Sequence, residues 1–92
     1  MQFEWDRRKA ATNFRKHGVR FDLALTVFSD ATAAIFSDPD HSDFEHRELI
    51  IGFDASGQLL VVSFVERAKR IRVISARRAT PHERHRHEEN VR

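Results

Sequence analysis

The sequence RELIIGFDASGQLLVVSFVERAKRIRVISAR, residues 47–77, contains three β-strand patterns separated by two short loops. Residues 47–53 and 58–66 flank the first loop, which ends in Gly57, where a hairpin usually needs a positive φ. The third pattern, residues 70–77, follows the loop 67–69. Because loops this short join antiparallel neighbours, they predict a three-strand antiparallel meander. The run from Leu59 to Val65 is apolar except at Ser63, which predicts a central strand with both faces at least partly covered.

The segment before the meander begins with a short strand and a helix. FEW at residues 3–5 is typical of a strand, and Asp6 can accept hydrogen bonds from the first free N–H groups of a helix beginning near Arg7. Gly18 suits the left-handed residue that ends such a helix, and Val19 is placed to fold back on its last turn.

Residues 20–46 predict a second helix, a strand and a loop. The helix is expected in RFDLALTVF, residues 20–28, and TAAIF, residues 32–36, is typical of a strand. SDPDHSDFEH, residues 37–46, is an acidic, turn-rich loop marked by Pro39. The apolar stripe of the helix consists of Phe21, Ala24, Leu25 and Phe28.

The C-terminal segment predicts a polar helix. Thr80-Pro81-His82-Glu83 forms a capping box with proline at the first helical position. The helix that follows has almost no apolar residues, so we expect it to project, fray or meet a partner rather than dock strongly on the core. The fold class is therefore α+β in a single domain, residues 1–92. Two N-terminal helices pack on an antiparallel sheet made of the three-strand C-terminal meander plus one or two further strands, and a C-terminal helix follows.

The amino-acid composition excludes several classes of protein. Eight phenylalanines and 40% apolar residues support a packed core, and the absence of cysteine excludes disulfides and thiolate metal sites. The chain has no signal-peptide run and no apolar stretch of about 20 residues, so we expect a cytoplasmic protein without a membrane association. Residues 1–58 carry a net charge of −3 and residues 59–92 a net charge of +5. The basic half could face a polyanion, or the two halves could pair internally.

Lys16 and His17 form the first candidate for chemistry, because they stand at the end of the first helix. The carbonyl groups there favour a cation, which suits an imidazolium acting as a general acid. The alternative is that both are ordinary last-turn residues, with His17 lying against Phe14.

The second candidate is a cluster of cations at the strand ends. Arginine forks grip phosphate, so the cluster could bind an RNA backbone and stabilise a pentavalent phosphorane. The alternative is a solvated sheet edge that resists aggregation. The cluster consists of Arg67, Lys69, Arg70, Arg72, Arg77 and Arg78.

Two groups of residues resemble metal sites only superficially. The acidic loop lacks the calcium-loop pattern, and the last helix has no HExxH motif, so we expect neither a metal nor another cofactor. One histidine amid lysine and arginine matches a metal-free phosphodiester transfer best. The loop residues are Asp38, Asp40, His41, Asp43, Glu45 and His46, and the helix histidines are His82, His85 and His87.

Over residues 2–86 the chain resembles the BrnT family, the toxin half of bacterial BrnT/BrnA toxin–antitoxin pairs. The resemblance rests on the order and spacing of FEWD at 3–6, KHGV at 16–19, DPDHS at 38–42, RELIIG at 47–52, LLVV at 59–62, RIRVISAR at 70–77 and ATPHER at 79–84. It implies a RelE-like fold and a metal-independent ribonuclease that inhibits translation. It also implies a BrnA-like antitoxin with a DNA-binding domain, whose complex with the toxin represses its own operon.

The resemblance places the charged motif positions of the family on Lys16, His17, Arg47, Glu66, Arg67, Arg72 and Arg77. We hypothesise that Glu66 or neutral Lys16 takes the 2′-proton, that Arg67 and Arg77 hold the phosphorane charge, and that His17 protonates the leaving oxygen. The residues assigned to RNA binding are Arg47, Lys69, Arg70, Arg72 and Arg78.

Other readings stay open at this point. The chain could be a non-catalytic nucleic-acid or protein interaction module, or a toxin that keeps antitoxin binding without activity. The apolar central strand and the polar last helix favour binding to a partner or to a second copy of the chain. The expected assemblies are a homodimer or a toxin–antitoxin heterotetramer.

Overall fold

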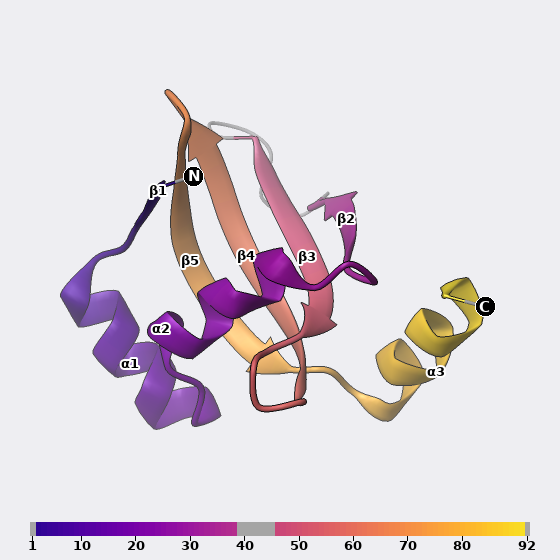
Figure 1. Cartoon of the computed structure of the whole chain (residues 1–92). Coiled ribbons are helices and arrows are strands. Elements are labelled where there is room, and N and C mark those ends of the chain that lie inside the picture. The colour runs from indigo at the N-terminus through magenta and orange to yellow at the C-terminus, as the bar shows by residue number, and fades with distance from the viewer. Residues whose placement is uncertain (1, 39–45, 92) are drawn as a thin grey trace.

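The computed structural model describes residues 2–38 and 46–91, which form one sheet with helices on both of its faces (Figure 1). The elements in chain order are β1 (Gln2–Glu4), α1 (Arg7–His17), α2 (Phe21–Ala24), the 3₁₀ helix η1 (Leu25–Ser29), β2 (Ala34–Ser37), β3 (Arg47–Phe53), β4 (Leu59–Arg67), β5 (Arg70–Arg78) and α3 (Pro81–Asn90).

The five strands lie in the order β1-β5-β4-β3-β2. The antiparallel meander β3-β4-β5 is present as expected, and β2 extends it antiparallel to β3. The expectation of an antiparallel sheet is wrong for the other edge, because β1 pairs parallel with β5. A three-residue strand carries no pattern that selects its partner, and the direction of β1 is set only when α1 packs beside β5.

The local signals around α1 act as predicted. The Asp6 carboxylate accepts hydrogen bonds from the N–H groups of Arg8 and Lys9, and the bond from Lys9 contributes most to lowering the pKa of Asp6. Gly18 has φ +71°, and its N–H donates to the Phe14 carbonyl at 2.8 Å. This left-handed residue ends α1 and turns the chain toward the sheet.

The buried residues of the second helical segment differ from the predicted apolar stripe. Only residues 21–24 are α-helical, and the chain continues as η1, whose 3.0 residues per turn place Val27 in line with Ala24 of α2. Phe21, Ala24 and Val27 are buried in the core under the helices, whereas Leu25 and Phe28 are only partly buried. The prediction assumed a period of 3.6 and therefore missed Val27.

The face of the sheet opposite α1 and α2 is covered less completely. A small cluster of Ile51, Leu59 and Val61 lies there, and α3 lies beside this face (Figure 1). The expectation that α3 does not dock strongly on the core leaves out one contact: His87 is only 2% exposed, and its ring lies edge-on to that of Phe53 with 5.9 Å between the ring centroids. The other residues of α3 are mostly exposed.

Candidate functional site

The strand register collects five arginines on the face of the sheet opposite α1 and α2. Residues that pair directly across neighbouring strands have their side chains on the same face of the sheet. Along β4, Val61, Val65 and Arg67 alternate with core residues that face the helices, so these three lie on the opposite face. Arg72 and Arg47 flank Val65, Arg70 pairs with Arg67, and Arg77 pairs with Val61. We call the side chains of Arg47, Arg67, Arg70, Arg72 and Arg77 the arginine face.

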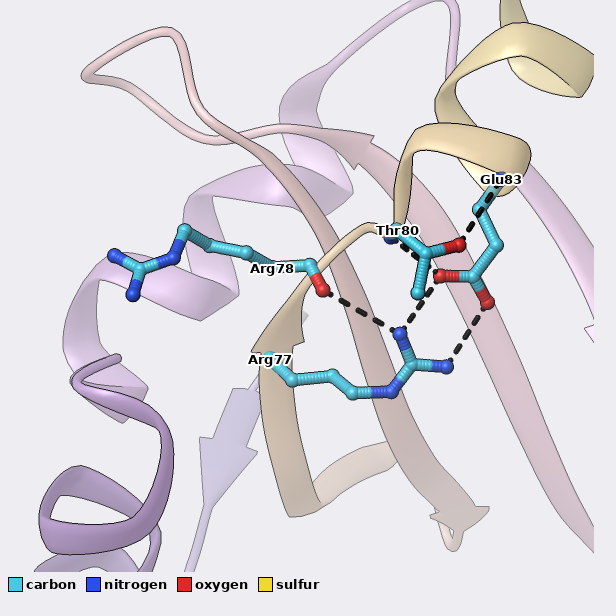
Figure 2. Close-up of polar contacts among 4 residues, drawn as sticks. All are labelled: Arg77, Arg78, Thr80 and Glu83. Carbon is cyan, nitrogen blue, oxygen red and sulfur yellow. Dashed lines mark hydrogen bonds and ion pairs between the residues drawn. The ribbon is translucent and has the colours of Figure 1, made fainter.

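Arg77 lies at one end of the arginine face and is joined to the first turn of α3. Its Nη1 donates to Oε1 of Glu83 at 2.7 Å and its Nη2 donates to Oε2 at 2.9 Å (Figure 2). The hydrogen bond from Arg77 is the main reason that the pKa of Glu83 falls to about 2, and Glu83 in turn raises the pKa of Arg77. Both groups are therefore charged at neutral pH.

Arg78 extends away from Arg77, toward the helices (Figure 2). Its Nη2 lies 4.0 Å from the position that a Cβ on Gly18 would occupy, so its guanidinium is beside the end of α1. A groove of about 300 Å³ runs along α1 and is lined by Lys16, His17 and Ser75, together with Arg8 and Lys9. The structure thus brings Lys16, His17 and Arg78 to the same end of α1.

Asn13 holds this end of α1 on the sheet. Its side-chain oxygen accepts from the N–H of Ala76 at 3.0 Å, and its side-chain nitrogen donates to the carbonyls of Ala76 at 2.8 Å and Val19 at 3.1 Å. Because β1 pairs only with residues 70–72, the edge of β5 at Ala76 has no strand beside it, and Asn13 takes its place. Asn13 is absent from the candidate residues identified from the sequence, because its neighbours one turn away along α1 are mostly polar and do not mark a buried side.

The remaining predicted catalytic residues lie at the other end of the sheet. Glu66 pairs with Ile71, whereas Arg77 pairs with Val61. Glu66 and Val61 are five residues apart along β4, a distance of about 17 Å. Glu66 also follows Phe64 on the helix side of the sheet, whereas Arg67 is on the arginine face. Lys69 occupies the two-residue turn between β4 and β5 with φ +68°. In this conformation Glu66, Arg67 and Arg77 do not converge on one phosphate.

Within residues 2–38 and 46–91 no group of three or more histidine, aspartate and glutamate side chains is placed to hold a metal ion. His85 pairs with Glu89 at 2.7 Å on the exposed side of α3, while His87 points into the sheet. Asp38 and His46 are described, whereas Asp40, His41, Asp43 and Glu45 of the acidic loop lie outside the described residues. No helix in the described part of the chain is long and apolar enough to cross a membrane.

The fold and the arginine face define a small α+β domain with a surface suited to a phosphate chain. A family model described as the ribonuclease toxin BrnT of type II toxin–antitoxin systems matches residues 5–83. The chain belongs to this BrnT family. Membership makes it a ribonuclease toxin, with RNA as the substrate and an antitoxin as the partner.

The structure is similar to the crystal structure of the Brucella abortus ribonuclease toxin BrnT. The two share 27% sequence identity over 87% of this chain and 97% of the Brucella chain, with a TM-score of 0.67. No relative among curated proteins matches the sequence. The family match ends at Glu83, so most of α3 lies beyond it.

Proposed function

We propose that this toxin is a metal-independent endoribonuclease of RelE-like fold that inhibits translation by cleaving RNA in the cytoplasm. The observation that carries the proposal is the arginine face, because five arginines on one sheet surface attract a polyanion. Two of them also pair with carboxylates, Arg70 with Glu4 at 3.7 Å and Arg77 with Glu83 at 2.7 Å. From Arg77 to the turn at Arg67 and Arg70 this face extends roughly 20 Å along β4, which is long enough for several nucleotides.

The chemistry is assigned to the groove at the end of α1. Ser75 pairs with Ser63 on the arginine face and also lines the groove that holds His17. An RNA strand that crosses β5 at Ser75 therefore contacts the arginine face and the groove together. At Ser75 the edge of β5 lies beyond β1, which pairs only with residues 70–72, and next to Ala76, which is bound by Asn13 of α1.

In the proposed reaction the 2′-oxygen of RNA attacks the adjacent 3′-phosphorus, and the bond from phosphorus to the 5′-oxygen breaks. A 2′,3′-cyclic phosphate and a free 5′-hydroxyl result. His17, as the imidazolium, gives its proton to the 5′-oxygen, and neutral Lys16 takes the proton from the 2′-hydroxyl. Of the two bases considered from sequence, Lys16 lies beside His17 while Glu66 is at the far end of the sheet. Arg78 holds the charge of the phosphorane.

The test is cleavage of an end-labelled RNA by the purified protein in excess EDTA. We expect 2′,3′-cyclic phosphate ends, and we expect His17→Ala to slow cleavage on the order of 10²-fold with an unchanged circular dichroism spectrum. His82→Ala is the matched control, since His82 is an exposed histidine at the start of α3. Cleavage that EDTA abolishes and a divalent cation restores would contradict metal independence. A folded wild type that binds RNA without cutting it, alone or with ribosomes, would favour a non-catalytic interaction module.

The antitoxin is proposed to be BrnA-like and to cover the arginine face. Light scattering on the purified toxin and on its complex separates a monomer, a homodimer and a toxin–antitoxin heterotetramer. A complex that leaves the arginine face open to RNA would overturn the proposed mode of neutralisation.

A further inference from the structure

We propose that Glu83 is a positioning residue for RNA binding: it fixes the end of the Arg77 guanidinium so that the Nε–Nη2 edge of Arg77 is the one presented to a phosphate. This inference rests on the proposed function, in which the arginine face holds RNA.

The donor groups of Arg77 are used unevenly. A guanidinium has five N–H groups. Two of them point at the Glu83 carboxylate, and Nη1 also reaches the carbonyl oxygen of Arg78 at 3.4 Å (Figure 2). Within the part of the chain that the structure describes, Nε and the second Nη2 hydrogen have no hydrogen bond. These two parallel donors form a side-on fork that matches two phosphate oxygens.

Glu83 is itself fixed by the start of α3. Its Oε1 accepts from the N–H of Thr80 at 2.9 Å, and its own N–H donates to the Thr80 hydroxyl at 3.2 Å. Pro81 occupies the first turn of the helix, where its fixed φ suits this geometry. The carboxylate is therefore part of a capping box and cannot easily turn away, so it gives Arg77 one orientation on the sheet.

The same geometry argues against a phosphate that displaces Glu83. The side chains of Arg77 and Glu83 are 39% and 30% exposed, and the carboxylate is charged at neutral pH. A phosphate at the end-on fork would leave that negative charge facing another negative charge. A phosphate on the Nε–Nη2 edge keeps the ion pair and adds two hydrogen bonds to the same guanidinium.

The experiment measures the affinity of a fully 2′-O-methylated RNA, which cannot be cleaved, for the wild type and five variants. Removing a negative charge near RNA should by itself tighten binding. We nevertheless expect Glu83→Ala to weaken binding about tenfold, because Arg77 loses its orientation. Glu88→Ala, which removes an exposed carboxylate from the same helix, should leave binding unchanged or slightly tighter. Glu83→Gln keeps an acceptor for Arg77 and for the cap, and should fall between wild type and Glu83→Ala.

The last two variants, Arg77→Ala and Arg77→Ala combined with Glu83→Ala, separate positioning from a merely structural role. In an Arg77→Ala background, Glu83→Ala should have no further effect on affinity, because Glu83 acts only through Arg77. An equal loss in both backgrounds would mean that Glu83 only stabilises the helix start, and tighter binding by Glu83→Ala would mean that it masks Arg77. Either result overturns the inference. The coupling is read from binding alone, so it is judged separately from whether the wild type cleaves RNA.

Discussion

At the scale of single residues, Asn13 joins the helical layer to the sheet. It is 6% exposed and makes three hydrogen bonds to backbone groups of Ala76 and Val19. The backbone groups of Ala76 lie at an edge of β5 that β1 does not reach, because β1 pairs only with residues 70–72. One side chain thus replaces a strand at the edge of β5 and fixes α1, with His17 one turn further along.

Asn13→Ala should lower the free energy of unfolding by about 2 to 4 kcal/mol, because it leaves buried backbone groups without hydrogen bonds. Urea denaturation followed by circular dichroism measures the change. Thr12→Ala, at the neighbouring exposed position, should change stability by less than about 0.5 kcal/mol. Similar midpoints for the two variants would show that Asn13 is not needed to hold α1.

At the scale of elements, α3 combines a polar composition with one buried contact. His87 is almost fully buried against Phe53, yet neither of its ring nitrogens has a hydrogen-bond partner among the described residues. A buried polar ring without partners costs free energy. The helix is therefore held at its start by the ion pair of Glu83 with Arg77. It contacts the sheet through His87, whose ring nitrogens have no hydrogen bonds among the described residues.

His87→Leu should raise the free energy of unfolding by about 1 to 2 kcal/mol, because leucine fills the same apolar contact without unsatisfied nitrogens. The measurement is the urea midpoint at pH 7. His85→Leu is the matched control, since the side chain of His85 is 70% exposed and pairs only with Glu89. A destabilised His87→Leu protein would mean that the imidazole makes a favourable polar interaction in solution.

At the scale of the whole molecule, the fold gathers on one face of the sheet several of the positive charges that the sequence concentrates in residues 59–92. The net charge of +5 in residues 59–92 reaches one surface because β4 and β5 turn Arg67, Arg70, Arg72 and Arg77 to the same side. Arg47 joins them from the acidic half of the chain. The formal net charge of +2 therefore understates the potential on this face.

Arg72→Ala should reduce the slope of log affinity against log salt concentration by about 0.7 for single-stranded RNA, since one phosphate contact is lost. Binding of a non-cleavable RNA at several salt concentrations gives the slope. Arg84→Ala on the exposed side of α3 should leave it unchanged. Equal slopes for the two variants would place the RNA elsewhere than on the arginine face.

Local signals made much of the architecture predictable. Asp6, Gly18 and Gly57 mark the ends of α1 and the β3–β4 turn, because caps and left-handed residues depend on neighbours in the chain. The apolar run of β4 and the short loops beside it indicated the meander. The BrnT motifs in the sequence indicated the family, and the family match confirms it.

The sequence by itself determined the strands of the meander, the bounds of α1, the capped start of α3 and the family, since each depends on residues close together in the chain. Only the tertiary structure decided that β1 runs parallel to β5, that Asn13 occupies the edge of β5, and that Glu83 holds Arg77. Pairing between distant segments depends on which packing arrangement buries the most apolar surface while satisfying backbone hydrogen bonds. A one-dimensional pattern does not contain that comparison, so the candidate residues could be identified one by one while their grouping could not.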